Sequence, residues 1–116
     1  LSSPFSWIQN ADQISQIRAQ HFPALAGKRM AIEGYLVTVK PTRTQNGQEM
    51  NFGTWIDADG QFFDSVHFPP SLRHYPFKGR SVYRLEGRVT EDFGVYSLEV
   101  ERMHKCQPLP DPRYSD

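Results

Sequence analysis

A mainly β fold, a small barrel of five strands, is predicted for this chain. Five runs of residues alternate apolar and polar side chains or are rich in β-branched and aromatic residues, which is typical of strands. Glycine-containing turns separate several of these runs, and a proline-rich stretch separates the third from the fourth. A chain of 116 residues is expected to form one domain, large enough to bury a core without disulfides.

The N-terminal segment, residues 1–27, is expected to be a connector. In the stretch ADQISQIRAQHF, Ile14 and Ile17 begin a three- and four-residue spacing that predicts one short amphipathic helix. Pro23 and Gly27 are expected to end this helix. It would pack on the edge of the domain, lead to an upstream domain, or do both.

The first three strands are expected in MAIEGYLVTVK, EMNFGTWID and QFFDSVHF. Gly34 in the middle of the first strand suggests a bulge or sharp bend, because a missing side chain lets a strand coil tightly. The second and third strands are expected to meet at the turn Asp59-Gly60.

The following stretch, PPSLRHYPFKGR, cannot be a strand because its three prolines lack the backbone donors that a sheet needs. We expect a loop here, with one helical turn around residues 71–75. The fourth and fifth strands are expected in SVYRLEGRVTED and VYSLEVERMHKC, with Phe93-Gly94 at the turn.

This order predicts an OB-fold barrel over residues 28–106, with the irregular or helical connection between strands three and four capping the barrel. A five-stranded SH3-like barrel is the competing fold. The long connection and the coiled first strand favour the OB-fold. Residues 107–116, QPLPDPRYSD, are expected to form an extended, proline-rich tail.

Charge and cysteine content narrow the classes of function. Thirteen cationic and thirteen anionic side chains cancel, which argues against tight, non-specific binding to duplex nucleic acid. The single cysteine, Cys106, excludes an intrachain disulfide and fits a reducing cytoplasm. We expect no membrane span, no signal peptide and no cofactor, and a monomeric domain cut from a longer protein, since the sequence does not begin with methionine.

The chain also resembles a known family over residues 28–101. The pattern GYLVTVKP, then EMNFGT, FFD and HFP, followed by YPFKG and EGRVTEDFG, is similar in order and spacing to the C-terminal OB domain of the bacterial DNA polymerase III alpha subunit. The resemblance implies an accessory module that lies near single-stranded template DNA and contacts other polymerase domains and replisome subunits. It implies no catalysis by this chain, because the family's metal-binding carboxylates lie in a palm domain that this sequence lacks.

OB-folds bind oligonucleotides on the face of strands two and three, helped by the loop between strands one and two. Lys40 and Arg43 at that loop are candidates for phosphate contacts, with Thr44 as a neutral hydrogen-bonding partner. A plain solvated hairpin tip is the alternative.

Two registers remain open for the second strand, and they decide which aromatic ring is exposed. Simple alternation turns Met50, Phe52 and Thr54 inward and leaves Trp55 outside. The family resemblance implies the opposite, with Trp55 buried and Phe52 outside as a stacking platform. We favour the second register and include Phe52 and Thr54 among the DNA-binding residues.

On the third strand, Ser65 and His67 are candidates for contact with a base edge, although His67 could instead satisfy a buried carbonyl. His104 and Cys106 are too few for a structural zinc site, which needs four ligands. No metal is therefore expected. Docking to another protein is the alternative function, favoured by the balanced charge and by the acidic hairpin at Glu91.

Overall fold

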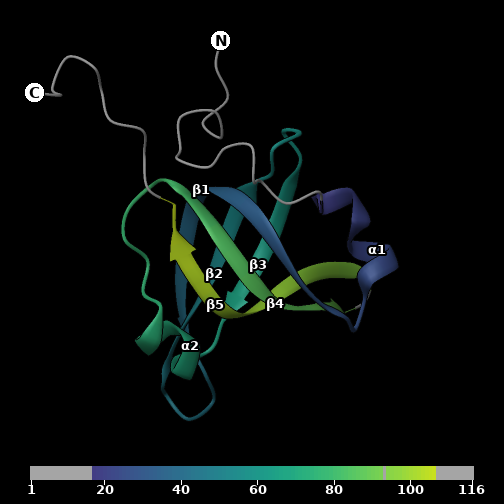
Figure 1. Cartoon of the computed structure of the whole chain (residues 1–116). Coiled ribbons are helices and arrows are strands. Elements are labelled where there is room, and N and C mark those ends of the chain that lie inside the picture. The colour runs from purple at the N-terminus through teal and green to yellow at the C-terminus, as the bar shows by residue number, and fades with distance from the viewer. Residues whose placement is uncertain (1–16, 93, 107–116) are drawn as a thin grey trace, which may run out of the picture.

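The computed structural model describes residues 17–92 and 94–106, and these form one closed barrel (Figure 1). The five strands are β1 (Arg29–Arg43), β2 (Glu49–Ile56), β3 (Phe62–His67), β4 (Val82–Asp92) and β5 (Val95–Lys105). Around the barrel they follow the order β1-β2-β3-β5-β4. All neighbouring pairs are antiparallel except β3 and β5, which run parallel. The predicted five-stranded barrel is confirmed, whereas the predicted tail lies outside the described residues.

The connection between β3 and β4 contains the short helix α2 (Pro69–His74). Its two prolines occupy the first turn, where the missing backbone N–H groups have no partner within a helix anyway. Proline therefore starts this helix and also excludes a strand. The expected helical connection is confirmed and begins two residues earlier than the predicted turn.

A short helix before β1 is also confirmed, but it lies later in the chain than the spacing predicts. A single 3-10 turn, η3 (Ala19–His21), runs into the four-residue helix α1 (Phe22–Leu25). Pro23 was expected to end the helix, yet it lies in the first turn of α1, where proline is tolerated. Gly27, with φ of +80°, follows the helix as expected. Ile17 is not helical, and the part of the predicted helix before it falls outside the described residues.

The first strand curls so far that it pairs with β2 along one part and with β4 along another, meeting both at Tyr35. The register shift lies between Leu36 and Thr38 rather than at Gly34. Gly34 serves a different purpose, because a Cβ atom there would lie 2.6 Å from the ring of Phe63. The glycine thus allows the core to approach the strand closely.

The core is built around Trp55, which is fully buried. Its ring stacks on Phe63 and Phe77 at centroid distances of 6.2 and 6.0 Å, and meets Tyr83 edge-on at 5.5 Å. Phe22 of α1 adds a further edge contact to Phe63 at 5.6 Å and so closes one end of the barrel. The register that buries Trp55 is therefore correct, and the register from simple alternation is wrong.

Candidate nucleic-acid interface

The outer face of β1, β2 and β3 presents an aromatic ring beside a cation. Lys40, Phe52 and Val66 are paired across the three strands and form one row. Lys40 is exposed, and the Phe52 side chain has 45% of its surface exposed. An exposed flat ring next to an ammonium group matches what unpaired bases and phosphates require.

A second exposed ring, Phe62, lies on the same face and was missed in the sequence analysis. Its exposure is 64%, while its neighbour Phe63 is buried. Successive strand side chains point to opposite faces, so the adjacent pair of phenylalanines already implied that one of them is outside. The face thus offers two aromatic platforms, one on β2 and one on β3.

The row between these two rings is polar and carries an acid. Thr54 is paired with Asp64 across β2 and β3, and the Thr54 hydroxyl donates a hydrogen bond to Asp64 Oδ1 at 3.4 Å. Thr54 lies on the outer face as expected, but its hydroxyl already has this partner. Because the carboxylate repels phosphate, the centre of the face favours bases over the DNA backbone.

The loop after β1 is a tight turn closed by hydrogen bonds between residues 44 and 48. Thr44 N–H donates to Gln48 O at 2.8 Å, Gly47 N–H donates to Thr44 O at 2.9 Å, and Gln48 N–H donates to the Thr44 hydroxyl at 3.1 Å. Arg43 folds over the turn and donates to Gly47 O at 2.9 Å. Thr44 therefore has a structural role in this turn. Its hydroxyl group can still donate a hydrogen bond to a ligand.

Within the described part of the chain, the two predicted phosphate-binding cations have no acidic partner. Among residues 17–92 and 94–106, no ion pair involves Lys40 or Arg43. Arg43 lies opposite Glu49 in the strand register, yet its guanidinium points to the loop carbonyl instead. Both side chains remain exposed.

Ser65 and His67 are not on this face, and the expectation that they meet a base edge is wrong. Both side chains are fully buried inside the barrel. Trp55 Nε1 donates to Ser65 Oγ at 2.7 Å, and Ser65 Oγ lies 2.7 Å from His67 Nε2. Gly53 makes room for this network, because a Cβ there would lie 2.7 Å from Ser65 Oγ. The choice of register that buries Trp55 also buries these two side chains.

Burial defines the charge state of His67. Ser65 Oγ accepts a hydrogen bond from Trp55 Nε1 and is also hydrogen-bonded to His67 Nε2, with the donor of the second bond set by the tautomer of the ring. Burial lowers the pKa of His67 from 6.5 to about 4. The ring is therefore neutral at pH 7, and its Nδ1 atom is buried with no hydrogen-bond partner among the residues that the structure describes.

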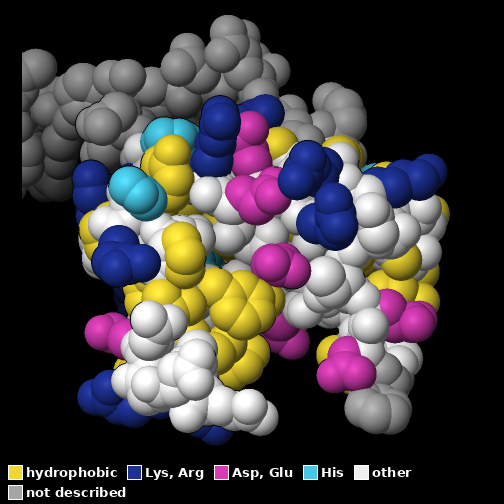
Figure 2. All heavy atoms as spheres, turned by 90° about the horizontal axis from the view of Figure 1, so that it is seen from below, with side chains coloured by type: hydrophobic (Ala, Val, Ile, Leu, Met, Phe, Trp, Pro, Cys, Tyr) yellow, Lys and Arg dark blue, Asp and Glu magenta, His cyan; other side chains and the backbone are white. Residues whose placement is uncertain are grey.

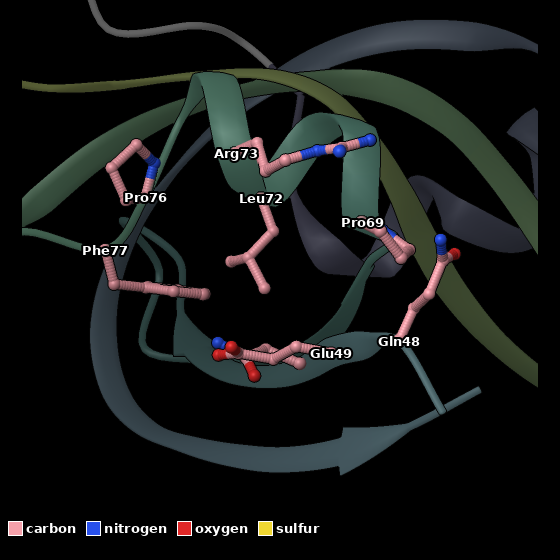
Figure 3. Close-up of a pocket in the computed structure, with 8 residues that line it drawn as sticks. Gln48, Glu49, Pro69, Leu72, Arg73, Pro76 and Phe77 are labelled. Carbon is pink, nitrogen blue, oxygen red and sulfur yellow. The ribbon is translucent and has the colours of Figure 1, made fainter. Parts of the chain in front are cut away.

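A pocket of about 600 Å³ opens at the end of the barrel that carries α2 (Figure 3). It lies between α2, the start of β2 and the segment after α2. Its walls are formed by Gln48, Glu49, Asn51, Pro69, Leu72, Arg73, Pro76 and Phe77. Seen from this end, hydrophobic side chains gather in the middle of the molecule, with basic and acidic groups interspersed around them (Figure 2).

The carboxylate of Asp57 has a structural role at the β2–β3 turn. Asp57 is buried and accepts hydrogen bonds from the backbone N–H groups of Ala19 at 2.7 Å and of Asp59 and Gln61 at 2.9 Å. It therefore holds the β2–β3 turn and the N-terminal segment together.

Within the described part of the chain, no three His, Cys, Asp or Glu side chains are placed to hold a metal ion. The described helices are also too short to cross a membrane.

Comparison with known proteins establishes the fold. No protein-family model matches the chain, and no curated protein matches it either. Among solved structures, it is similar to the second OB-fold domain of replication protein A from Methanococcus maripaludis, with a TM-score of 0.51 and 12% sequence identity. The similarity covers 74% of this chain and 91% of that one. The barrel is thus an OB-fold, as the sequence predicted.

Proposed function

We propose that this OB-fold chain binds single-stranded DNA weakly, through the outer face of β2 and β3 and the loop that follows β1. The observation that carries the proposal is Phe52, which is 45% exposed on a strand whose other aromatic residue is fully buried. Exposing a phenylalanine to water is unfavourable, and a base stacked on the ring would relieve this cost.

The expected affinity follows from the groups on the face. Stacking contributes about 1–3 kcal/mol per base, and Phe52 and Phe62 offer two platforms. Lys40 and Arg43 are the two cations expected to contact phosphates, whereas the carboxylate of Asp64 repels the phosphates. This combination favours a short, weakly held stretch of unpaired DNA.

We further propose that the chain is the OB module of a bacterial replicative DNA polymerase III alpha subunit. The order and spacing of GYLVTVKP, EMNFGT, HFP and EGRVTEDFG support this parentage. Tethering to a polymerase raises the effective concentration of a weak site to about millimolar, so weak binding suffices. In this context the chain itself is not an enzyme, and nucleotidyl transfer belongs to the parent polymerase. The solved relative is itself a domain of replication protein A, which is consistent with a role in replication.

Fluorescence anisotropy of labelled oligo-dT at low salt tests the DNA-binding proposal. We expect Phe52→Ala to weaken binding by roughly tenfold, because it removes one stacking platform. The free energy of unfolding should hardly change, since the side chain is exposed. Unchanged affinity in Phe52→Ala, or no binding by the parent chain at high protein concentration, would contradict the proposal.

Protein docking through the same face is the second candidate, favoured by Asp64 between the two exposed rings. The double variant Lys40→Ala/Arg43→Ala separates the candidates. DNA binding should fall in this variant, and it should persist in the control Arg102→Ala/Lys105→Ala, which removes the same charge from β5. Equal losses of DNA binding in both variants would mean that binding depends on overall charge and not on Lys40 and Arg43, whereas unchanged DNA binding in both would favour docking.

A further inference from the structure

A second cavity, of about 270 Å³, lies where β3, the start of β5 and α1 meet. We call it the Phe62 cleft. Its main walls are formed by Phe22, Pro23, Phe62, Phe63, Asp64 and Tyr96. Phe62 and Asp64 both point outward from β3 and are exposed, so the cleft opens onto the candidate DNA-binding face. Its volume is small for a whole ligand but sufficient for a single flat base.

Aromatic rings flank the Phe62 cleft on two strands. Phe62 is 64% exposed, and Tyr96 is half-buried near the start of β5. Tyr96 lies opposite Glu91 in the β4–β5 register, and hydrogen bonding to that carboxylate raises the pKa of the tyrosine hydroxyl. Because the hydroxyl already has this partner, the ring itself is what Tyr96 offers to a ligand. Rings of this kind stack on every base and therefore do not select one.

The group in the cleft that can distinguish the bases is the carboxylate of Asp64. It is exposed, and its hydrogen bond from the Thr54 hydroxyl to Oδ1 is long, at 3.4 Å. No described Lys, Arg or His side chain forms an ion pair with Asp64. A carboxylate only accepts hydrogen bonds, so its oxygens are open to donors of a ligand that approaches from solvent.

The edges of the four DNA bases match a carboxylate unequally. The two oxygens accept best from two donors that lie side by side. Guanine presents such a pair, its N1–H and its 2-amino group. Thymine has one N–H between two carbonyl oxygens, and adenine and cytosine each place a ring-nitrogen acceptor next to the amine. The second carboxylate oxygen is repelled by these acceptors, whereas guanine satisfies both oxygens.

We propose that the Phe62 cleft binds one guanine of single-stranded DNA. Asp64 accepts hydrogen bonds from the N1–H and the 2-amino group while the purine stacks on Phe62. In an unpaired strand this edge of the base is free, and it faces away from the phosphates that Asp64 repels. The base preference rests on the proposed function, because it adds selection to a face that otherwise stacks any base.

Fluorescence anisotropy with three short oligonucleotides tests the preference. The first is oligo-dT, the second carries one central guanine in place of a thymine, and the third carries hypoxanthine there, which lacks only the 2-amino group of guanine. The guanine oligonucleotide should bind about fivefold more tightly than oligo-dT, the lower end for a bidentate contact to a base, because Asp64 is exposed. Hypoxanthine should lose most of this gain.

Two matched variants show whether Asp64 is responsible. Asp64→Asn has nearly the same shape, but its amide offers one acceptor oxygen and cannot take both donors of guanine. This variant should bind the guanine and hypoxanthine oligonucleotides equally, and it should bind oligo-dT more tightly because the repulsion of phosphate is gone. Glu49→Gln removes the same charge from the exposed start of β2 and should keep the guanine preference.

The outcomes separate this proposal from the proposed function. Equal binding of guanine and hypoxanthine by the parent chain would overturn the cleft proposal alone, provided that oligo-dT binds. A difference that survives Asp64→Asn, or that also disappears in Glu49→Gln, would overturn it as well. A guanine preference that persists while Phe52→Ala leaves all affinities unchanged would retain the cleft and contradict the proposed stacking on Phe52. Absence of binding by all three oligonucleotides would overturn both.

Discussion

At the residue scale, Trp55, Ser65 and His67 form a buried hydrogen-bonded network inside the barrel. This network explains why the expectation that Ser65 and His67 contact a base is wrong. Serine and histidine next to an exposed face are reasonable contacts for a base, and the sequence contains both on β3. The structure turns them inward, where serine connects two ring nitrogens at 2.7 Å on each side. The indole N–H of Trp55 needs a buried hydrogen-bond acceptor, which explains why polar residues occur at positions 65 and 67 inside the barrel.

The first prediction at this scale concerns pH. Burial holds the pKa of His67 at about 4 in the folded chain, below its ordinary 6.5, so the unfolded chain binds a proton at higher pH than the folded chain does. The contribution of His67 to the free energy of unfolding is therefore fully present above pH 6.5. It is lost as the pH falls toward 4, by about 3 kcal/mol in total.

Urea unfolding at a series of pH values measures this effect. The free energy of unfolding should fall more steeply between pH 6.5 and 4 in the parent chain than in His67→Gln, whose amide does not titrate. The amide of the variant can donate to Ser65 Oγ or accept from it, so it can replace either form of the His67–Ser65 hydrogen bond. Parallel pH profiles of the two proteins would show that His67 is protonated at the same pH in the folded and unfolded states.

At the element scale, β1 decides the geometry of the barrel because it pairs with strands on both sides. Gly34 in its middle was expected to mark a bulge or sharp bend, but no register shift occurs at Gly34. The register shift falls after Leu36, and Gly34 is instead pressed against the ring of Phe63. Contact between residues so far apart in sequence depends on barrel closure.

Gly34→Ala is expected to lower the free energy of unfolding by about 1–3 kcal/mol, the usual cost of overpacking a core. The added Cβ would lie 2.6 Å from Phe63 Cζ and 3.1 Å from Trp55 Cβ. Denaturant unfolding measures the loss. In a Phe63→Leu background the same change should cost less, because the closest ring atom is gone. Equal costs in both backgrounds would place the strain elsewhere.

At the scale of the whole molecule, balanced charge and a mixed surface limit how DNA can be held. Basic and acidic side chains alternate around the α2 end instead of forming one basic surface (Figure 2). Lys40 and Arg43 lie near one edge of the candidate face, and neither forms an ion pair with another described residue. The charges of the protein therefore contribute more to the orientation of a bound DNA strand than to its binding free energy.

The salt dependence of oligo-dT binding should be shallow. Each phosphate contact to a single strand contributes a slope of about −0.7 in a plot of log affinity against log salt, so two contacts predict about −1.4. Lys40→Ala/Arg43→Ala should bring the slope close to zero. A parent slope several times steeper would mean that other cations contact the phosphates.

The alternation of β-rich runs, the glycine turns and the prolines after β3 sufficed to predict the strands, their order and the capping helix, because these signals act within a few residues. The chain sequence alone could not determine which face of β2 and β3 is inside, since shifting a strand by one residue exchanges its two faces at no local cost. Burial of Trp55 against Phe63, Phe77 and Tyr83 made that choice. Only barrel closure, which brings distant side chains together, exposed Phe52 and Phe62, buried Ser65 and His67, and formed the pocket at Asn51.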